Sequence, residues 1–126
     1  MGARLIRAEE APHFEVEGAQ VVGYASPSRG SMAVSTWRVV LGAGVSSPVH
    51  QLTVDETFIA LEGAAEYHVG TRVYQVRAGD GFTVEAGTAF RIANTGLVPF
   101  QAVVCVPAGA QAQIGEGQPF IPPWAA

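Results

Sequence analysis

Two side chains in the stretch PVHQLTVDE, His50 and Glu56, are of the types that move protons in enzymes. A carboxylate that holds an imidazole by a hydrogen bond leaves the other ring nitrogen free to exchange a proton with a bound molecule. In that interpretation His50 is the general acid or base and Glu56 is its orienting partner. Burial would raise the pKa of Glu56, whereas a neighbouring imidazolium would lower it.

The same two residues allow two other interpretations. They could form a satisfied, charge-assisted hydrogen bond inside a protein that binds a ligand without chemistry or is purely structural. They could also belong to a metal site. That site would be weak, because catalytic zinc or iron normally takes three protein ligands. The residue types leave all three interpretations open.

The elements that must position these side chains are short β-strands. Apolar and polar residues alternate with a period of two, a glycine recurs about every eight to twelve residues, and no long stretch has helical periodicity. Gly70 and Thr71 join two alternating runs in the manner of a β-hairpin. The pattern predicts an all-β closed barrel or sandwich. Strands are expected at residues 20–25, 31–41, 48–53, 56–61, 64–69, 72–77, 81–85, 88–94 and 98–106.

Alternation along these strands predicts which side chains share a cavity. His50 and Leu52 lie two positions apart and therefore face the same side of their strand. Glu56 and Phe58 share a face of the next strand for the same reason. With both faces turned inward, the four side chains line one cavity.

Aromatic residues are expected to complete the walls of this cavity. Trp37 would contribute to one wall, and Phe82 and Phe90 to the opposite one. They are either ordinary core, because small barrels are usually filled with side chains, or an apolar slot for a flat organic ligand.

Two motifs in this region resemble the signatures of the cupin superfamily. The first, in GVSSPVHQLTVDETFIALEG, matches at Gly44, His50, Glu56 and Gly63. The second, in GDGFTVEAGTAFRIAN, matches at Gly79, Gly87 and Asn94. The resemblance covers about residues 31–106 and implies an all-β, single-domain cupin-like β-barrel, also described as a double-stranded β-helix or jelly roll.

The chain departs from the family pattern at the residues that would hold a metal. In the family, three histidines and the glutamate bind a divalent ion, but Leu52 and Phe90 stand here at two of the histidine positions. Glu85 also replaces the usual proline. Large apolar side chains fill the space that an ion and its waters would need. We therefore predict no cofactor.

The resemblance and the residues together predict a barrel that binds a small, largely apolar organic molecule. By resemblance, the protein could be a metal-independent isomerase or cyclase that uses His50 and Glu56. The alternatives are a non-catalytic ligand-binding or sensing cupin, and a metal-dependent enzyme with a reduced ligand set. The expected ligand-binding residues are Trp37, Leu52, Phe58, Phe82 and Phe90.

Composition limits the partners. The 126 residues carry a net charge of −4 with scattered basic residues, which argues against a nucleic-acid surface. No apolar run approaches the roughly 18 residues of a membrane span. A lone Cys105 and the lack of a visible secretory signal fit a cytoplasmic protein. Many members of the resembled family pair through sheet edges, and an unpaired edge is a liability, so a homodimer is expected.

Residues 1–126 are expected to form one domain, with N-terminal strands in residues 1–30 and a barrel core at about 31–106. Residues 107–126 form a proline-rich C-terminal arm, in which regular structure is disfavoured. Phe120, Ile121 and Trp124 would be costly to leave in water. The arm therefore either packs on the outside of the barrel or a partner subunit, or helps to close the mouth of a pocket.

Overall fold

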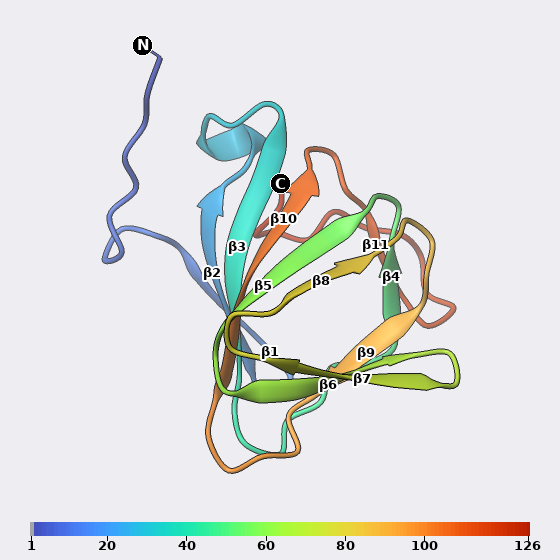
Figure 1. Cartoon of the computed structure of the whole chain (residues 1–126). Helices are drawn as coiled ribbons and strands as arrows, with labels where there is room; N and C mark the ends of the chain where they lie inside the picture. The colour runs from blue at the N-terminus through green and yellow to red at the C-terminus, as the bar shows by residue number, and fades with distance from the viewer. Residues whose placement is uncertain (1) are drawn as a thin grey trace.

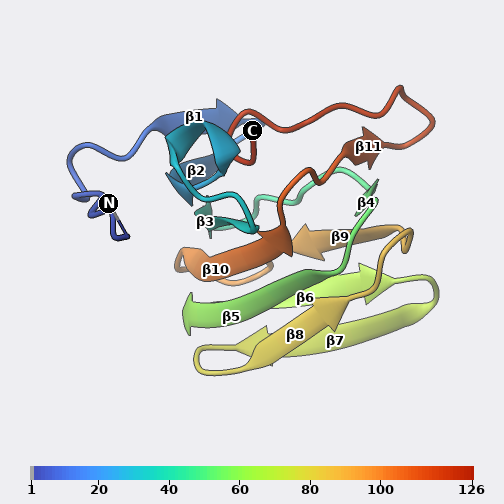
Figure 2. The same cartoon turned by 90° about the horizontal axis from the view of Figure 1, so that it is seen from above.

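The computed structural model describes residues 2–126, which form two antiparallel β-sheets (Figure 1). The first sheet has the strand order β1-β2-β3-β10-β5-β8, and the second has the order β11-β4-β9-β6-β7. Seen from above, the strands of the two sheets lie in facing layers (Figure 2). The strands are β1 (His13–Val16), β2 (Ala19–Ala25), β3 (Val34–Leu41), β4 (His50–Leu52), β5 (Glu56–Glu62), β6 (Ala64–Val69), β7 (Arg72–Arg77), β8 (Gly81–Val84), β9 (Phe90–Ala93), β10 (Phe100–Pro107) and β11 (Ala112–Ile114).

This arrangement confirms the predicted all-β jelly roll. Residues 2–126 contain no α-helix, and one short 3-10 helix, η1 (Pro27–Arg29), lies between β2 and β3. Within the same described residues, no helix is both long and apolar enough to cross a membrane.

Strand alternation builds the core between the sheets. In β10, Phe100, Ala102, Val104 and Val106 are buried and the residues between them are more exposed. Val104 is paired on one side with Trp37 of β3 and on the other with a phenylalanine of β5. The inward side chains of neighbouring strands therefore stand in rows across the sheet, as the period of two requires.

All nine predicted strands are present, with ends that differ by up to three residues. Two strands were missed by the sequence analysis: β1 (His13–Val16) and β11 (Ala112–Ile114). β11 has only three residues, and each of them pairs with a residue of β4. A segment this short carries too little alternation to be recognised, and its pairing with β4 depends on residues far away in the chain.

Asn94, one of the motif positions, fastens the loops at one end of the barrel. Its buried side-chain amide donates hydrogen bonds to the carbonyl oxygens of Leu41, Gly42 and Val98 at 3.0, 3.1 and 2.8 Å. Its side-chain oxygen accepts a hydrogen bond from the backbone of Gly96 at 3.0 Å. One side chain therefore supplies partners for backbone groups of two loops, and its role is structural.

Candidate functional site

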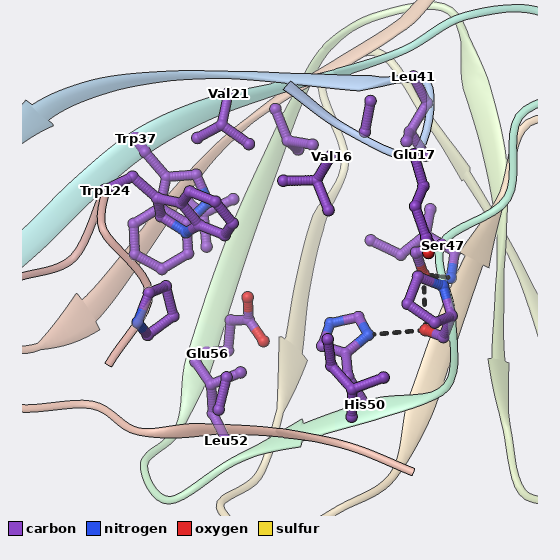
Figure 3. Close-up of a pocket in the computed structure, with 18 of the residues that line it drawn as sticks. Val16, Glu17, Val21, Trp37, Leu41, Ser47, His50, Leu52, Glu56 and Trp124 are labelled. Carbon is purple, nitrogen blue, oxygen red and sulfur yellow. Dashed lines mark hydrogen bonds between the residues drawn. The ribbon is translucent and has the colours of Figure 1, made fainter. Parts of the chain in front are cut away.

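A cavity of about 230 Å³ lies between the two sheets. The inner faces of β2, β3, β4, β5 and β10 contribute to its walls, and the C-terminal arm contributes on one side. Its size is just below the lower end of the range for small-ligand pockets, about 300–1,000 Å³. Most of the lining is apolar, and His50 and Glu56 are directed into it from neighbouring parts of the barrel (Figure 3).

His50, the first residue of β4, is held by the backbone that precedes it. Its Nδ1 atom lies 2.9 Å from the carbonyl oxygen of Pro48. A carbonyl oxygen only accepts hydrogen bonds, so Nδ1 carries the hydrogen in this contact. Burial lowers the pKa of His50 below its usual value, although the bond to Pro48 opposes this in part. The ring is therefore neutral at neutral pH, and Nε2 presents a lone pair to the cavity.

Glu56, the first residue of β5, is buried with 5% of its surface exposed. Its Oε1 atom has no hydrogen-bond partner among the described residues. Burial disfavours the charged form and raises the pKa of the carboxyl from 4.5 to about 8. At pH 7 the group is consequently a neutral carboxylic acid with a proton to donate.

The structure corrects the expectation that Glu56 orients His50. Within residues 2–126 no hydrogen bond or ion pair joins the two side chains, and the carbonyl of Pro48 holds the imidazole instead. A strong ion pair would have lowered the pKa of Glu56 and raised that of His50. Because both groups shift the other way, the cavity holds a neutral base and a neutral acid that are separately available to a ligand.

Three of the five predicted ligand-binding residues line the cavity: Trp37, Leu52 and Phe58. The other two face the interior but lie outside the lining. Phe90 is paired with His50 across β4 and β9, and its ring packs against the imidazole with 4.4 Å between ring centroids. It supports His50 and does not bound the cavity.

Phe82 lies farther away because of its place in the sheet. It belongs to the edge strand β8 and is paired with Phe58 of β5, so it stands one strand beyond the cavity wall. Its ring packs against Tyr67 and Tyr74, with centroid distances of 4.6 and 5.2 Å. Alternation predicted the correct face for Phe82, but not its distance from the cavity.

Residues of the C-terminal arm, which the sequence analysis did not assign to the site, complete the lining. Phe120, Pro122 and Trp124 border the cavity. The Trp124 ring lies 6.4 Å from that of Trp37 between centroids, and both rings lie on the same side of the cavity (Figure 3). Of the two expectations for the arm, the structure therefore favours closure of the pocket. The signal in the sequence was the cost of leaving these apolar side chains in water.

Hydrogen bonds anchor the end of the arm on the barrel. The Arg29 guanidinium donates to the carbonyl oxygen of Trp124 at 2.8 Å, and the Ser35 hydroxyl donates to that of Ala125 at 2.8 Å.

Glu17, in the turn between β1 and β2, also lines the cavity. Its backbone has φ of 49°, which is uncommon for a residue other than glycine.

The donor groups at the cavity do not fit a family-type metal centre. The described residues include no group of three or more His, Cys, Asp or Glu side chains placed to hold a metal ion. Leu52 lines the cavity and Phe90 packs on the imidazole at the two positions where the resembled family has further histidines. His50 and Glu56 alone fall short of the three protein ligands of a catalytic centre. We therefore derive no step through a metal.

The family model described as "Cupin domain" matches residues 37–107, which is more than half of the chain. No curated protein matches the chain significantly in sequence. The fold is similar to that of the polyketide cyclase RemF from Streptomyces resistomycificus, with a TM-score of 0.75, 12% identity, and coverage of 83% of this chain and 79% of that one.

Two further solved structures share the fold. An uncharacterised protein with a double-stranded β-helix domain from Klebsiella pneumoniae has a TM-score of 0.74 and 20% identity, covering 90% of this chain and 98% of that one. A sugar phosphate isomerase of the cupin superfamily from Silicibacter pomeroyi has a TM-score of 0.73 and 15% identity, covering 90% and 82%. At these identities the likeness concerns the fold alone.

Proposed function

The chain belongs to the cupin family, and on that premise we propose that its barrel binds a small, largely apolar organic molecule and moves a proton on it. The reaction class is a metal-independent isomerisation or cyclisation. The observation that carries the proposal is that a neutral His50 and a buried Glu56 without a hydrogen-bond partner line the same apolar cavity.

The two residues would act as base and acid on opposite ends of a polarised group. His50 Nε2 removes a proton from a carbon beside a carbonyl, while Glu56 donates its proton to the carbonyl oxygen. This step gives an enol, an imidazolium and a carboxylate. When the substrate has a carbon–carbon double bond next to the deprotonated carbon, the enol is a dienol. Return of the proton from His50 to the far carbon of that dienol, and of the enol proton to Glu56, shifts the double bond and restores both neutral groups.

The relatives show which chemistry this fold can host. RemF is described as a polyketide cyclase, and the Silicibacter protein as a sugar phosphate isomerase. Among residues 2–126 no arginine lines the cavity, and the sequence contains no lysine. A phosphate group would therefore lack a cationic partner, and this favours a substrate of the less polar kind.

Proton transfer can be tested with a generic ketone. We expect the protein to accelerate the exchange of the α-protons of 2-tetralone in D2O, followed by NMR. His50→Ala should lower the rate by about 100-fold or more, the usual contribution of a general base, and leave the affinity within a few-fold. His13→Ala is the matched control, because His13 is exposed on β1 and does not line the cavity.

The alternatives give different results. Equal exchange rates for the wild type and His50→Ala, with the ketone bound, would favour a binding or sensing protein without chemistry. A metal-dependent enzyme would instead purify with close to one equivalent of metal when no ion is added, and it would lose activity with a chelator. Metal below about a tenth of an equivalent would contradict that alternative.

A further inference from the structure

The cavity offers no arginine or lysine from the described part of the chain to a ligand. Among the described residues, its titratable lining groups are Glu17, His50 and Glu56. The Tyr67 hydroxyl, which comes from β6, is close enough to Glu56 to interact with it electrostatically, and it too has no hydrogen-bond partner within residues 2–126. All seven basic residues of the chain are arginines, and none borders the cavity. An anion in this space would therefore be desolvated without a cationic partner.

Two polar atoms face the cavity with opposite hydrogen-bonding capacity. Nε2 of His50 is an acceptor, because the Pro48 carbonyl fixes the hydrogen on Nδ1. The carboxyl of Glu56 is a donor in its neutral form, and its Oε1 atom is buried without a partner. A buried group in this state gains a full hydrogen bond when a ligand supplies the missing partner.

The remaining walls favour a flat apolar body. Trp37, Leu52 and Phe58 of the lining come from strands of the barrel, and Trp124 comes from the arm. The indole rings of Trp37 and Trp124 are inclined at 59° to one another. Aromatic faces of this kind contribute large apolar contact areas to a planar ligand. With about 230 Å³ available, the ligand is small.

We propose that the site selects an electrically neutral, flat apolar molecule through one oxygen group that accepts a hydrogen bond from Glu56. In the proposed reaction this is the carbonyl or enol oxygen of the substrate, and a hydroxyl in the same place can also donate a hydrogen bond to His50. This inference rests on the proposed function and names its substrate class. A hydroxyl fits because it offers one donor and spare acceptor capacity. An ammonium group offers three donors and no acceptor, so beside His50 it would face the Glu56 proton, and the exposed Glu17 would be the remaining acidic side chain of the lining to pair with it.

Three compounds with one skeleton test this selection: 2-naphthalenemethanol, 2-naphthoate and 2-naphthylmethylammonium. Their affinities are measured by calorimetry at pH 6.5 on the full chain. We expect the alcohol to bind at least 10-fold more tightly than either ion. An ion that binds as tightly as the alcohol would overturn the proposal, and so would the failure of all three to bind.

Variants of Glu56 test the contact with the hydroxyl. Glu56→Gln keeps a neutral donor and should retain the affinity for the alcohol within about threefold. Glu56→Leu removes the donor, so its affinity for the alcohol should be about 10-fold lower than that of the wild type. Its affinity for 2-methylnaphthalene, which has no hydroxyl, should equal that of the wild type. Equal losses for both compounds would show that only packing had changed, and would contradict the proposed contact.

These binding results are independent of the ketone exchange. If the alcohol is selected but His50→Ala does not slow exchange, the ligand class stands and the proposed chemistry fails. If exchange depends on His50 but the naphthoate ion binds as tightly as the alcohol, the chemistry stands and the selection for neutral ligands fails.

Discussion

At the scale of single residues, one cause acts on His50 and Glu56 in opposite directions. Burial removes the charge from each, lowering the pKa of the imidazole and raising that of the carboxyl. The bond from His50 to Pro48 keeps the ring in place without a carboxylate. The result is an acid and a base that have not neutralised each other, which is the condition for both to act on one ligand.

The metal ligands missing from the cavity can be restored by substitution. Leu52 lines the cavity, and Phe90 is paired with His50. The double variant Leu52→His with Phe90→His would therefore place three imidazoles near Glu56, the donor set of the resembled family. We expect it to retain about one equivalent of Ni²⁺ after dialysis, measured by elemental analysis, with the wild type below a tenth.

A matched control adds the same number of histidines elsewhere. Leu61 and Val73 are exposed at 48% and 51% on β5 and β7, so Leu61→His with Val73→His should not gain the ion. If the control also retains Ni²⁺, the ion binds to histidines on the surface, and retention by the first variant would not indicate a site in the cavity. A wild-type protein with a full equivalent would mean that His50 and Glu56 hold a metal with fewer ligands than expected.

At the scale of elements, the sequence predicted the irregular structure of the C-terminal arm but not the place where the arm packs. The prolines predicted an irregular segment, and the cost of exposing Phe120 and Trp124 predicted that it packs against something. Where it packs depends on β11, whose three residues pair with β4, and on the bridge between Ala112 and Phe120. Such contacts join distant parts of the chain, and no local pattern encodes them.

The arm should matter for binding as well as for packing. Trp124→Ala removes an aromatic wall of the cavity, so we expect the affinity for 2-naphthalenemethanol to fall about 10-fold, in line with the loss of about 1–2 kcal/mol of apolar contact. Ile121→Ala is the control, because Ile121 lies in the same arm, is 48% exposed and does not line the cavity. Calorimetry with both variants checks this, and equal losses would mean that the arm acts only through its overall stability.

At the scale of the whole molecule, alternation explains how much of the site could be predicted. It identifies the face on which a side chain lies, and this brought His50, Leu52, Glu56 and Phe58 to one cavity, as the structure has them. It does not give the position of a side chain along or across the barrel, and for that reason Phe82 was placed too near. The expected homodimer stays a prediction, which the mass in solution would test.

Stability should depend on pH through Glu56 in a defined window. The folded-state pKa is raised from 4.5 to about 8, so between these values the folded protein keeps a proton that the unfolded chain has lost. The free energy of unfolding therefore falls as the pH rises through this range, by at most about 1.4 kcal/mol per pH unit for one group. The pKa of His50 is lowered in the folded protein, so His50 makes the free energy of unfolding rise with pH, but only below the unfolded-state pKa of 6.5.

The interval from pH 6.5 to 8 consequently separates the two residues, and urea denaturation at several pH values within it measures the slope. Glu56→Gln cannot ionise, so the difference between the wild type and this variant isolates Glu56. We expect the wild type to lose stability relative to the variant as the pH rises, and the difference to level off above about pH 8. Parallel curves across the interval would mean that Glu56 is already ionised in the folded protein, and the neutral acid on which the proposed proton transfer depends would be absent.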